Sequence, residues 1–540
     1  MTEPPAPAAL PGLPAWACRL LAAVLILGAA GLHIAYLAHD CPLDLSPDEA
    51  HYYDWSRHLD WSYYSKGPLV AYLIRAGCEV AGPWSEQNTA SVAFAVRLPA
   101  VVCGSLLLLS LYILTVQVHR RETLGLAAVG VALTLPLIAA GASIMTIDSP
   151  YTCCWGWALV LGHRAIFRGS WWAWPAAGLA VGVGILAKYT MVLWLPSVGL
   201  FLLAQPDRRR LLLRPGFWAM SAVAGLFCLP ILIWNMRNGW VTYYHVDHLT
   251  GAGFHWTGPF NYVGGQAALL MGYWFLVWAA AMTRHSPLTE TDPGMRYLWW
   301  LSAPMFLVFL AFSFKTDGGE PNWPVTAYLS GLVLAAAWLP RQLAAPARWR
   351  RWSMAALLAG ACGLGLTATV LMHHTNWMAP LLAQLSGPAT ADRPMPMRRF
   401  DPTCRLRGWR ALGKALDEKR AELAEAEHDE PILAASSWAL PGEMGVYCAG
   451  HPQAYSIGLV MGDRHSQYDL WQNPLRDMEA FRKRTFIVVG WLSDEAKDAF
   501  ETVDKPVDVV YSEDGRPISQ WTITVCHKYH GFASVPKGGF

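Results

Sequence analysis

Two neighbouring carboxylates, Asp48 and Glu49, lie in a polar loop between two apolar segments. In a membrane protein, a carboxylate beside the hydrocarbon costs a few kcal/mol or more unless it faces water or a partner, so its presence suggests a function. The same loop contains three more polar side chains with chemical potential, His51, Tyr52 and Lys66. We therefore look for chemistry first at the acidic pair.

Three further polar clusters lie where other apolar segments end. They contain Asp148, then Asn235, and finally the group Lys315, Glu320 and Asn322. Asp148 has an alternative interpretation as a helix cap, because an aspartate before Ser-Pro satisfies free backbone donors at a helix start. Three loop histidines lack the spacing of a fixed metal site, so surface positions are favoured for them. These are His245, His248 and His255.

The composition indicates that these clusters belong to a polytopic α-helical membrane protein. Of 540 residues, 54% are hydrophobic and 15% are charged, whereas soluble domains have about 25% charged residues. About eleven segments approach the ~20 residues that cross ~30 Å of hydrocarbon. The first of them is interpreted as a retained signal anchor with the N-terminus inside. The segments are residues 17–37, 91–118, 123–141, 149–167, 171–187, 189–204, 216–234, 262–283, 297–314, 324–339 and 352–371.

Basic residues are distributed unequally between the two sides of this predicted bundle. Cytoplasmic loops of membrane proteins carry an excess of Lys and Arg. With the N-terminus inside, the inner loops carry Arg120, Arg121, Arg164, Arg168, Arg208, Arg209, Arg210, Arg214, Arg284, Arg296, Arg341, Arg348, Arg350 and Arg351. The loops with the acidic clusters then face outside, at residues 38–90, 142–150, 235–262 and 315–323.

A small set of basic residues breaks this rule on the predicted outer side. It includes Lys66, Arg97, Lys188 and Lys315. Cations beside acidic loops are the arrangement expected for holding an anionic ligand. The alternative is that each side chain extends to phospholipid headgroups.

The composition changes beyond residue 385. Residues 398–430 are charged and largely helical in pattern, and short strand-like runs follow at 432–435, 485–489, 507–511 and 521–525. We predict a transmembrane domain over residues 1–385 and a small α/β domain over residues 386–540. An odd number of spans puts the second domain outside the membrane.

Other motifs narrow the class of protein. The eleven cysteines form no metal-ligand pattern. A disulfide is permitted outside the cytoplasm, and Cys448 with Cys526 is one pairing hypothesis. The sequence has no Walker A motif, no Gly-x-Ser-x-Gly elbow and no internal repeat, which disfavours ATP-driven pumps, hydrolases and inverted-repeat transporters.

Several of these motifs together carry a family resemblance. The chain resembles the C-type (GT-C) membrane glycosyltransferases, in particular the bacterial family 39 type related to protein O-mannosyltransferases and the lipid A aminoarabinose transferase. The resemblance covers about residues 20–375 and is carried by residues 47–52, 66–68, 95–99, 148–150, 187–189, 233–240 and 320–324. One departure is Gly67, which separates Lys66 from Pro68 where the aminoarabinose enzyme has two prolines after the lysine.

The resemblance implies a GT-C fold and an inverting transferase that moves a sugar from a polyprenyl-phosphate carrier to an acceptor hydroxyl. Asp48 would be the general base, and Glu49 would orient the loop or the acceptor. Asp148 would be a second acid near the acceptor or, as in some relatives, a metal ligand. The four outward cations, Lys66, Arg97, Lys188 and Lys315, would neutralise the lipid phosphate. The remaining expected substrate contacts are His51, Tyr52, Asn235, Glu320 and Asn322.

The expected surroundings follow from the same resemblance. The protein would span the bacterial cytoplasmic membrane several times, with its active site and its C-terminal domain on the outer face. Its partners would be a polyprenyl-phosphate-linked donor, membrane lipids and an envelope acceptor of open identity, with no nucleic acid. A divalent metal is left open.

Two other classes of function agree less well with the sequence. A flippase or transporter for lipid-linked sugars would need charged groups at the bilayer midplane, whereas the acids here cluster at one face. A non-catalytic membrane scaffold would have degenerate catalytic residues, and the retention of Asp48 and Lys66 argues against it.

Overall fold

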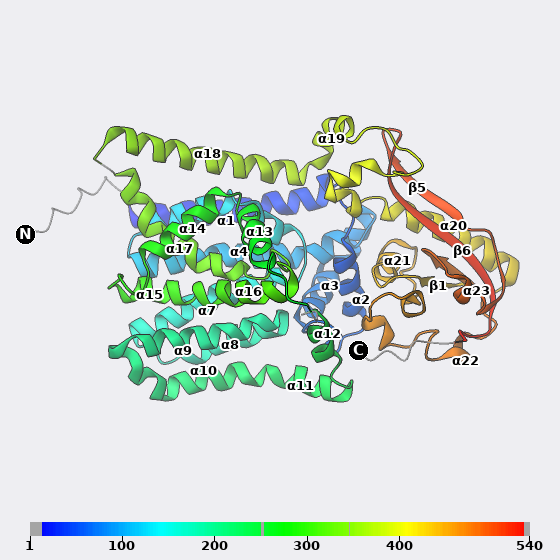
Figure 1. Ribbon diagram of the computed structural model, residues 1–540, viewed down its shortest axis with the longest axis horizontal. Helices are drawn as coiled ribbons and strands as arrows, with labels where there is room; N and C mark the ends of the chain where they lie inside the picture. Colours follow the sequence, from blue (N-terminus) through cyan, green and yellow to red (C-terminus); the bar gives the residue numbers. More distant parts are fainter. Residues whose placement is uncertain (1–12, 250–252, 345, 534–540) are drawn as a thin grey trace, which may run out of the picture. The chain divides into compact units, whose positions relative to one another are not determined.

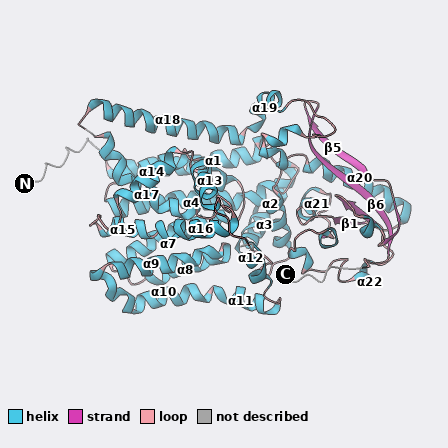
Figure 2. Ribbon diagram, in the orientation of Figure 1, coloured by secondary structure: helices cyan, strands magenta, loops and turns pink. Residues whose placement is uncertain are grey.

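The computed structural model describes residues 13–249, 253–344 and 346–533. Helices make up most of these residues, and a sheet forms near the C-terminus (Figures 1 and 2). The chain forms two compact units. Unit 1 contains Met1–Ala35, Ala100–Asn238 and Val246–Met372, and unit 2 contains Tyr36–Pro99, Gly239–His245 and His373–Phe540. The first polar loop and the C-terminal domain are therefore parts of the same unit.

Unit 1 is built mainly from apolar helices that overlap the predicted segments, whereas the short helix at Pro206–Leu213 is basic and lies between two of them. Its elements are α1 (Ala15–Ala35), the main part of α4 (Ala93–His119), α5 (Glu122–Leu133), α6 (Pro136–Ser143), α7 (Asp148–Arg168), α8 (Ala173–Ala187), the short helix η2 (Tyr189–Leu193), α9 (Trp194–Ala204), η3 (Pro206–Leu213), α10 (Pro215–Leu226), α11 (Cys228–Arg237), α13 (Gly258–Leu269), α14 (Tyr273–Arg284), α15 (Pro293–Trp300), α16 (Ala303–Thr316), α17 (Val325–Leu343) and α18 (Arg348–His373).

Fewer of these helices are long enough to span a membrane than the sequence predicts. Within the described residues, five helical stretches are long and apolar enough, and two bent pairs raise the number to seven. Three other predicted spans form apolar helices of 10–17 residues. The predicted span 149–167 forms α7, which has 21 residues but is not among the stretches apolar enough to cross. The membrane-spanning character is confirmed, but the count of about eleven spans is not.

The bends have local causes. Pro136 occupies the first turn of α6 and removes a backbone donor, and α5 and α6 meet at 74°. Gly272 has a φ of 67° between α13 and α14, which meet at 111°. This left-handed conformation is accessible to glycine and ends a regular helix. An apolar run in the sequence continues through both breaks, so hydropathy alone predicts one straight span at each place.

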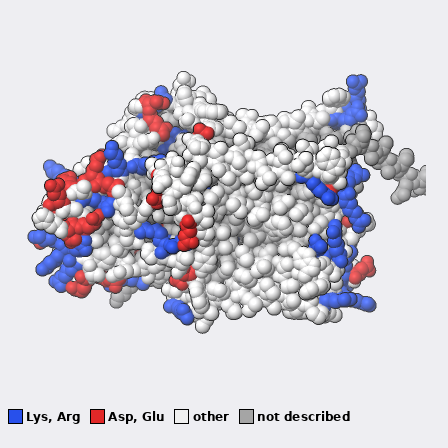
Figure 3. Space-filling view, turned by 180° about the vertical axis from the view of Figure 1, so that it is seen from behind, with Lys and Arg blue, Asp and Glu red and all other residues white. Residues whose placement is uncertain are grey.

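Basic loops of unit 1 lie at a common end of its helices. Arg19, near the start of α1, forms an ion pair of 2.5 Å with Glu122 at the start of α5. Arg208 donates a hydrogen bond of 3.1 Å to the carbonyl of Ile166 near the end of α7. Figure 3 shows Lys and Arg gathered at the right-hand end of unit 1, beside a broad band without charged side chains. The prediction that these loops share one side of the bundle agrees with this arrangement.

Unit 2 combines short helices with one sheet. Its helices include η1 (Tyr36–Asp40), α2 (Pro47–Arg57), α3 (Leu69–Thr89), α19 (Ala379–Ser386), α20 (Trp409–Glu427), α21 (Pro441–Tyr447), α22 (Met478–Phe481) and α23 (Asp494–Lys497), and five residues of α12 (Val241–Leu249) also belong here. The strands are β1 (Ile432–Ala435), β2 (Ala454–Ser456), β3 (Phe486–Val489), β4 (Phe500–Val503), β5 (Val507–Glu513) and β6 (Arg516–Tyr529).

The sheet is of mixed direction. Its strand order is β2-β1-β3-β6-β4, and β5 pairs with β6. The pairs of β1 with β2 and with β3 are parallel, whereas β6 is antiparallel to β3, β4 and β5. The four predicted strands are present, and β2 and β4 are additional. β2 has only three residues, and the middle of β4 is polar and exposed, so neither strand forms the apolar run that marks β1 and β3.

The faces of the sheet carry separate hydrophobic clusters. One contains Leu412 and Leu416 of α20, together with Ile487 and Cys448. The other contains Phe486, Phe500, Tyr529 and Cys526. Since successive residues of a strand point to opposite faces, neighbours such as Phe486 and Ile487 divide between the clusters. The sheet is thus covered on both sides.

The disulfide hypothesis is wrong in this structure. All eleven cysteines are free, and Cys448 and Cys526 belong to different clusters of the sheet domain. Both thiols are buried, so each serves as a packing residue.

Alkylation of the unfolded protein tests this assignment. We expect an alkylating reagent in denaturant without reductant to modify all eleven cysteines. A parallel sample with reductant should have the same mass by intact-protein mass spectrometry. Two adducts fewer in the first sample would contradict the assignment.

Candidate functional site

The first polar loop folds into α2 because its sequence contains a complete helix start. Ser46 is the N-cap, its hydroxyl accepts a hydrogen bond from the Glu49 amide, and the Glu49 carboxylate accepts one from the Ser46 amide. Pro47 occupies the first helical position, where a missing backbone donor has no cost. Asp48, on the same turn, remains exposed, whereas Glu49 is fully buried. The two acids of the pair therefore have different environments.

Buried Glu49 forms an ion pair with Arg97. Nε and Nη2 of Arg97 donate to the two carboxylate oxygens of Glu49, each at 2.9 Å. The side chains are 4% and 0% exposed. Such a two-fold contact between a guanidinium and a carboxylate has strong directional preference. The pair joins α2 to the first turns of α4.

The remaining Arg97 donors bind the chain before α2. Nη1 donates to the carbonyl of Leu43 at 3.0 Å and to Sγ of Cys41 at 3.4 Å, and Nη2 donates to the carbonyl of Asp44 at 2.7 Å. A guanidinium has five N–H groups, and these contacts with the two to Glu49 engage five. The sequence predicts that Arg97 contacts a phosphate, but its donors hold the loop.

Asp44 attaches this loop to the C-terminal domain within unit 2. Its carboxylate accepts a hydrogen bond of 3.0 Å from Nε of Arg410 and one of 2.9 Å from the Trp409 amide. Burial raises the pKa of the Asp44 carboxyl, and Arg410 opposes that shift. Sequence reasoning missed Arg410, because no local motif marks an arginine as the partner of an acid hundreds of residues away.

The other predicted substrate-binding residues of this loop differ in how deeply they are buried. His51 is 6% exposed, and its ring lies 4.9 Å from the ring of Trp55 and 4.8 Å from that of Tyr468. Burial lowers the pKa of His51 to about 3, so it is a neutral packing residue. Tyr52 is also buried. Lys66 is half-buried, and its backbone carbonyl accepts a hydrogen bond from the Tyr63 amide at 3.1 Å.

In unit 1, three predicted residues from different loops meet. Lys188 Nζ lies 2.8 Å from Oδ1 of Asp148, and Nδ2 of Asn322 donates to Oδ2 of the same carboxylate at 2.6 Å. Asp148 is the first residue of α7, and Lys188 follows the end of α8. The N-cap of α7 is Ile147, and no side-chain capping bond is formed there. The Asp148 carboxylate therefore binds Lys188 and Asn322 at this helix start and does not cap the helix.

Hydrogen bonds to α13 hold the loop after α16, which contains Asn322. Asp317 ends α16 with a φ of 48°, and its carboxylate accepts hydrogen bonds from Thr257 at 2.9 Å and Asn261 at 3.0 Å. Gln266 donates to the carbonyl of Pro321 at 3.1 Å. Asp317 and Gln266 were not predicted as site residues. Their roles depend on α13, which is distant in sequence.

The last three predicted residues lie elsewhere on unit 1. Lys315 is exposed in the final turn of α16, and Glu320 is exposed in the loop after it. Asn235 is buried in α11 and donates to the carbonyl of Ile231 at 3.0 Å. The structure brings together Asp148, Lys188 and Asn322.

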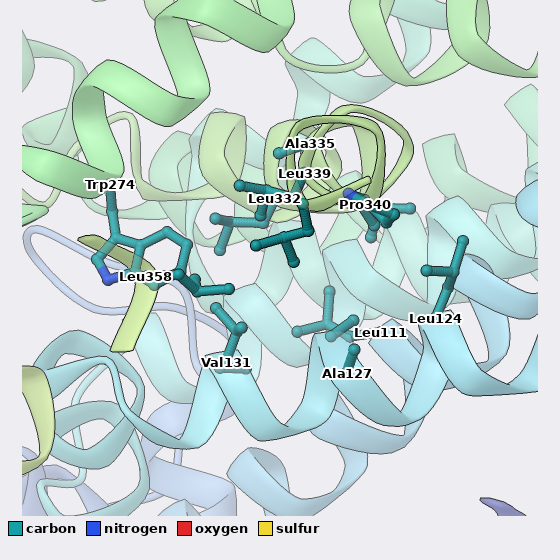
Figure 4. A pocket seen from close by; sticks show the side chains of 15 residues that line it. Leu111, Leu124, Ala127, Val131, Trp274, Leu332, Ala335, Leu339, Pro340 and Leu358 are labelled. Carbon is teal, nitrogen blue, oxygen red and sulfur yellow. The ribbon is translucent and has the colours of Figure 1, made fainter. Parts of the chain in front are cut away.

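A cavity of about 210 Å³ lies beside this cluster. Its polar lining includes Asp148, Asn322 and Thr152, and the rest is mainly aliphatic. A second cavity of about 120 Å³ has an apolar lining and shares Leu332 with the first. Figure 4 shows side chains of α5 and α17 facing each other across it. A polar end and an apolar extension suit an amphipathic ligand.

The residues do not fit the metal that the resemblance left open. Among the described residues, no group of three or more His, Cys, Asp or Glu side chains is placed to hold an ion. Asp148 Oδ1 and Oδ2 are engaged by Lys188 and Asn322.

Breaking the buried ion pair should destabilise the protein. Arg97→Gln leaves the Glu49 carboxylate buried without its cation, which costs about 3–5 kcal/mol. We expect a lower unfolding temperature of the purified protein in detergent.

Arg75→Gln is the matched control. Arg75 also pairs with a glutamate, Glu79, but the side chains are 47% and 61% exposed. Water screens such pairs, so no measurable change is expected. Equal unfolding temperatures for the two variants would contradict the structural role of the Arg97 pair.

Comparison with known proteins identifies relatives of the chain. Residues 65–234 match a family model described as dolichyl-phosphate-mannose-protein mannosyltransferase. The lipid A galacturonosyltransferase RgtD of Rhizobium johnstonii is 27% identical over 325 residues, which are 58% of this chain and 64% of that protein. An undecaprenyl phosphate-α-4-amino-4-deoxy-L-arabinose arabinosyl transferase of Pectobacterium atrosepticum is 28% identical over 180 residues, 30% of this chain and 31% of that protein. The chain thus spans less than two thirds of each relative.

A solved structure shares the fold over nearly the whole chain. ArnT from Cupriavidus metallidurans bound to undecaprenyl phosphate has a TM-score of 0.55 and 16% identity, covering 95% of this chain and 98% of that one. Its apo form has a TM-score of 0.52. The chain therefore shares the fold of this glycosyltransferase, and its residues 65–234 are similar to the mannosyltransferase family.

Proposed function

We propose that the protein is an inverting glycosyltransferase that moves a sugar from a polyprenyl-phosphate carrier to an envelope acceptor on the outer face of the cytoplasmic membrane. The observation that carries this proposal is the exposed Asp48 carboxylate, fixed on the first turn of α2 by its buried neighbour Glu49. A fixed carboxylate that solvent reaches can accept a proton from a bound hydroxyl group. The names of the two relatives supply the substrate classes of the proposal, a polyprenyl-phosphate donor and a lipid A acceptor.

The reaction assigns one role to each group. Asp48 accepts the proton of the acceptor hydroxyl group, while the oxygen of that hydroxyl group forms a bond to the anomeric carbon of the donor sugar. The bond from that carbon to the phosphate oxygen breaks on the opposite face, so the configuration inverts and polyprenyl phosphate leaves. Lys66, in the same loop, stabilises the charge that develops on the phosphate. Glu49 and Arg97 keep α2 in place during the transfer.

The unit 1 cluster suits the polar end of a lipid substrate. Lys188 remains close to a carboxylate, so the Asp148 cluster offers both a cation and hydrogen-bonding groups to a headgroup. The adjoining cavities offer an apolar lining to a chain. We assign Asp148, Lys188 and Asn322 to lipid-substrate binding, and Lys315 and Glu320 to the loop around them.

Lipid A is the acceptor that the relatives favour. RgtD is named as a lipid A galacturonosyltransferase. A reconstitution assay tests this directly: purified protein, lipid A and undecaprenyl-phosphate donors carrying either galacturonic acid or 4-amino-4-deoxy-arabinose. We expect a mass increase of lipid A by one sugar residue. Transfer to a protein or to another envelope glycan, and not to lipid A, would replace lipid A as the proposed acceptor. The absence of transfer from every polyprenyl-phosphate sugar would refute the proposed function.

Replacing Asp48 should separate binding from chemistry. Asp48→Asn keeps the shape of the side chain but cannot accept the proton, so turnover should fall by about two to four orders of magnitude. Binding of the donor lipid should remain within about threefold of the natural protein by a filter or fluorescence assay.

Two further variants make the result specific. Lys66→Ala should weaken donor binding, because it removes the cation proposed for the phosphate. Glu79→Gln changes an exposed carboxylate on α3 and should leave turnover unchanged. Full activity of the Asp48→Asn variant would show that the Asp48 carboxylate is not the general base.

A further inference from the structure

The C-terminal domain makes a close backbone contact with α2 inside unit 2. A Cβ atom added to Gly442 of α21 would lie 2.6 Å from the carbonyl carbon and 2.7 Å from the carbonyl oxygen of Ala50, and 2.8 Å from the His51 nitrogen. Side chains do not approach backbone atoms this closely. Gly442 therefore allows α21 to rest directly on the helix that carries Asp48 and Glu49.

The next residue, Glu443, is buried in an unusual environment. It is 1% exposed, and neither carboxyl oxygen has a hydrogen-bond partner among the described residues. Its surroundings include the carboxylates of Asp44 and Glu49 and the guanidinium of Arg97. Burial, followed by the repulsion of these carboxylates, raises the pKa of Glu443 well above its ordinary value. A neutral carboxyl group is the form that fits this packing.

Further contacts join the same surfaces. The Tyr447 hydroxyl of α21 accepts a hydrogen bond of 2.6 Å from the Leu45 amide, just before α2. On the other side of Gly442, the ring of Trp438 lies 5.6 Å from that of His51. The contact therefore extends from the loop before α2 into its second turn.

We propose that α21 positions α2, and with it Asp48 and Glu49, through the backbone contact at Gly442 and the carboxyl group of Glu443. This inference rests on the proposed function and deepens it, because it makes the C-terminal domain part of the positioning of the base. Misplacing a reacting group by about 1 Å can cost about 100-fold in rate. Lys66 lies outside α2, so donor affinity should be much less sensitive.

Two glycines of α21 provide a matched pair of variants. Gly442→Ala places a methyl group against the backbone of α2. Gly445→Ala adds the same methyl group one turn later, where the nearest atom is the terminal Nη1 of Arg57 at 3.2 Å. Neither glycine has a positive φ, so both variants gain similar helix propensity. Arg57 ends α2 but meets this methyl group through its flexible side chain, so the difference between the variants isolates the contact with the backbone of α2.

Hydrogen exchange and kinetics then test the inference in the full-length protein. Gly442→Ala should speed amide exchange in residues 47–57 at least about fivefold and lower kcat about 10- to 100-fold, with KM for the donor nearly unchanged. Gly445→Ala should change neither quantity. Equal exchange in the two variants would overturn the inference.

Glu443→Gln tests the carboxyl group separately. Because the folded pKa is raised, the contact is stable while Glu443 is protonated and weakens as the pH rises through that pKa. The groups that face Glu443 are Asp44, Glu49, Arg97, Tyr447 and Tyr468. Glu443→Gln should keep kcat at a pH below this pKa and remove the decrease in kcat and unfolding temperature that the natural protein shows as the pH rises through it. Identical pH profiles for both proteins would exclude a role for this group.

The exchange and unfolding experiments do not require turnover. If the natural protein transfers no sugar, the proposed function fails, while exchange in α2 still decides the positioning contact. If it transfers sugar and Gly442→Ala behaves like Gly445→Ala, only the positioning contact fails.

Discussion

The buried ion pair between Glu49 and Arg97 is the constraint on which the first polar loop depends. Removing two charges from water costs several kcal/mol per ion, and only close, fully bonded geometry repays it. Here the guanidinium also binds backbone carbonyls of the preceding loop, so one arginine fixes both the loop and the first turn of α2. The consequence is a division of labour within the acidic pair: Glu49 is structural, and Asp48 remains exposed on a rigid turn.

The second charged cluster follows the same principle at lower burial. Asp148 and Lys188 are 21% and 11% exposed, and Asn322 completes the contacts of the carboxylate. A pair that water still reaches can exchange partners more easily than the Glu49 pair. This difference supports assigning the Asp148 cluster to substrate and the Glu49 pair to architecture.

The C-terminal domain is more closely tied to the first loop than its place in the sequence suggests. Asp44 is bound by Arg410, Leu45 by Tyr447, and α2 rests on Gly442. Backbone contacts and buried carboxyl groups therefore tie this domain to the segment that carries Asp48. Its proposed part in the reaction is therefore to hold the base in position.

The sequence by itself determined the local features. Apolar runs predict most helices of unit 1, and the charged helical pattern of residues 398–430 predicts α20, because hydropathy patterns act between near neighbours. The capping box of Ser46 and Glu49 is equally local, although the prediction from sequence places these residues in a loop. The tertiary structure decided which side chains bind one another and where the apolar helical runs bend. Arg97 binds Glu49 instead of facing a phosphate, Cys448 and Cys526 lie in separate clusters, and two apolar runs bend. Such outcomes depend on which surfaces meet across long sequence separations, and no local pattern records that competition.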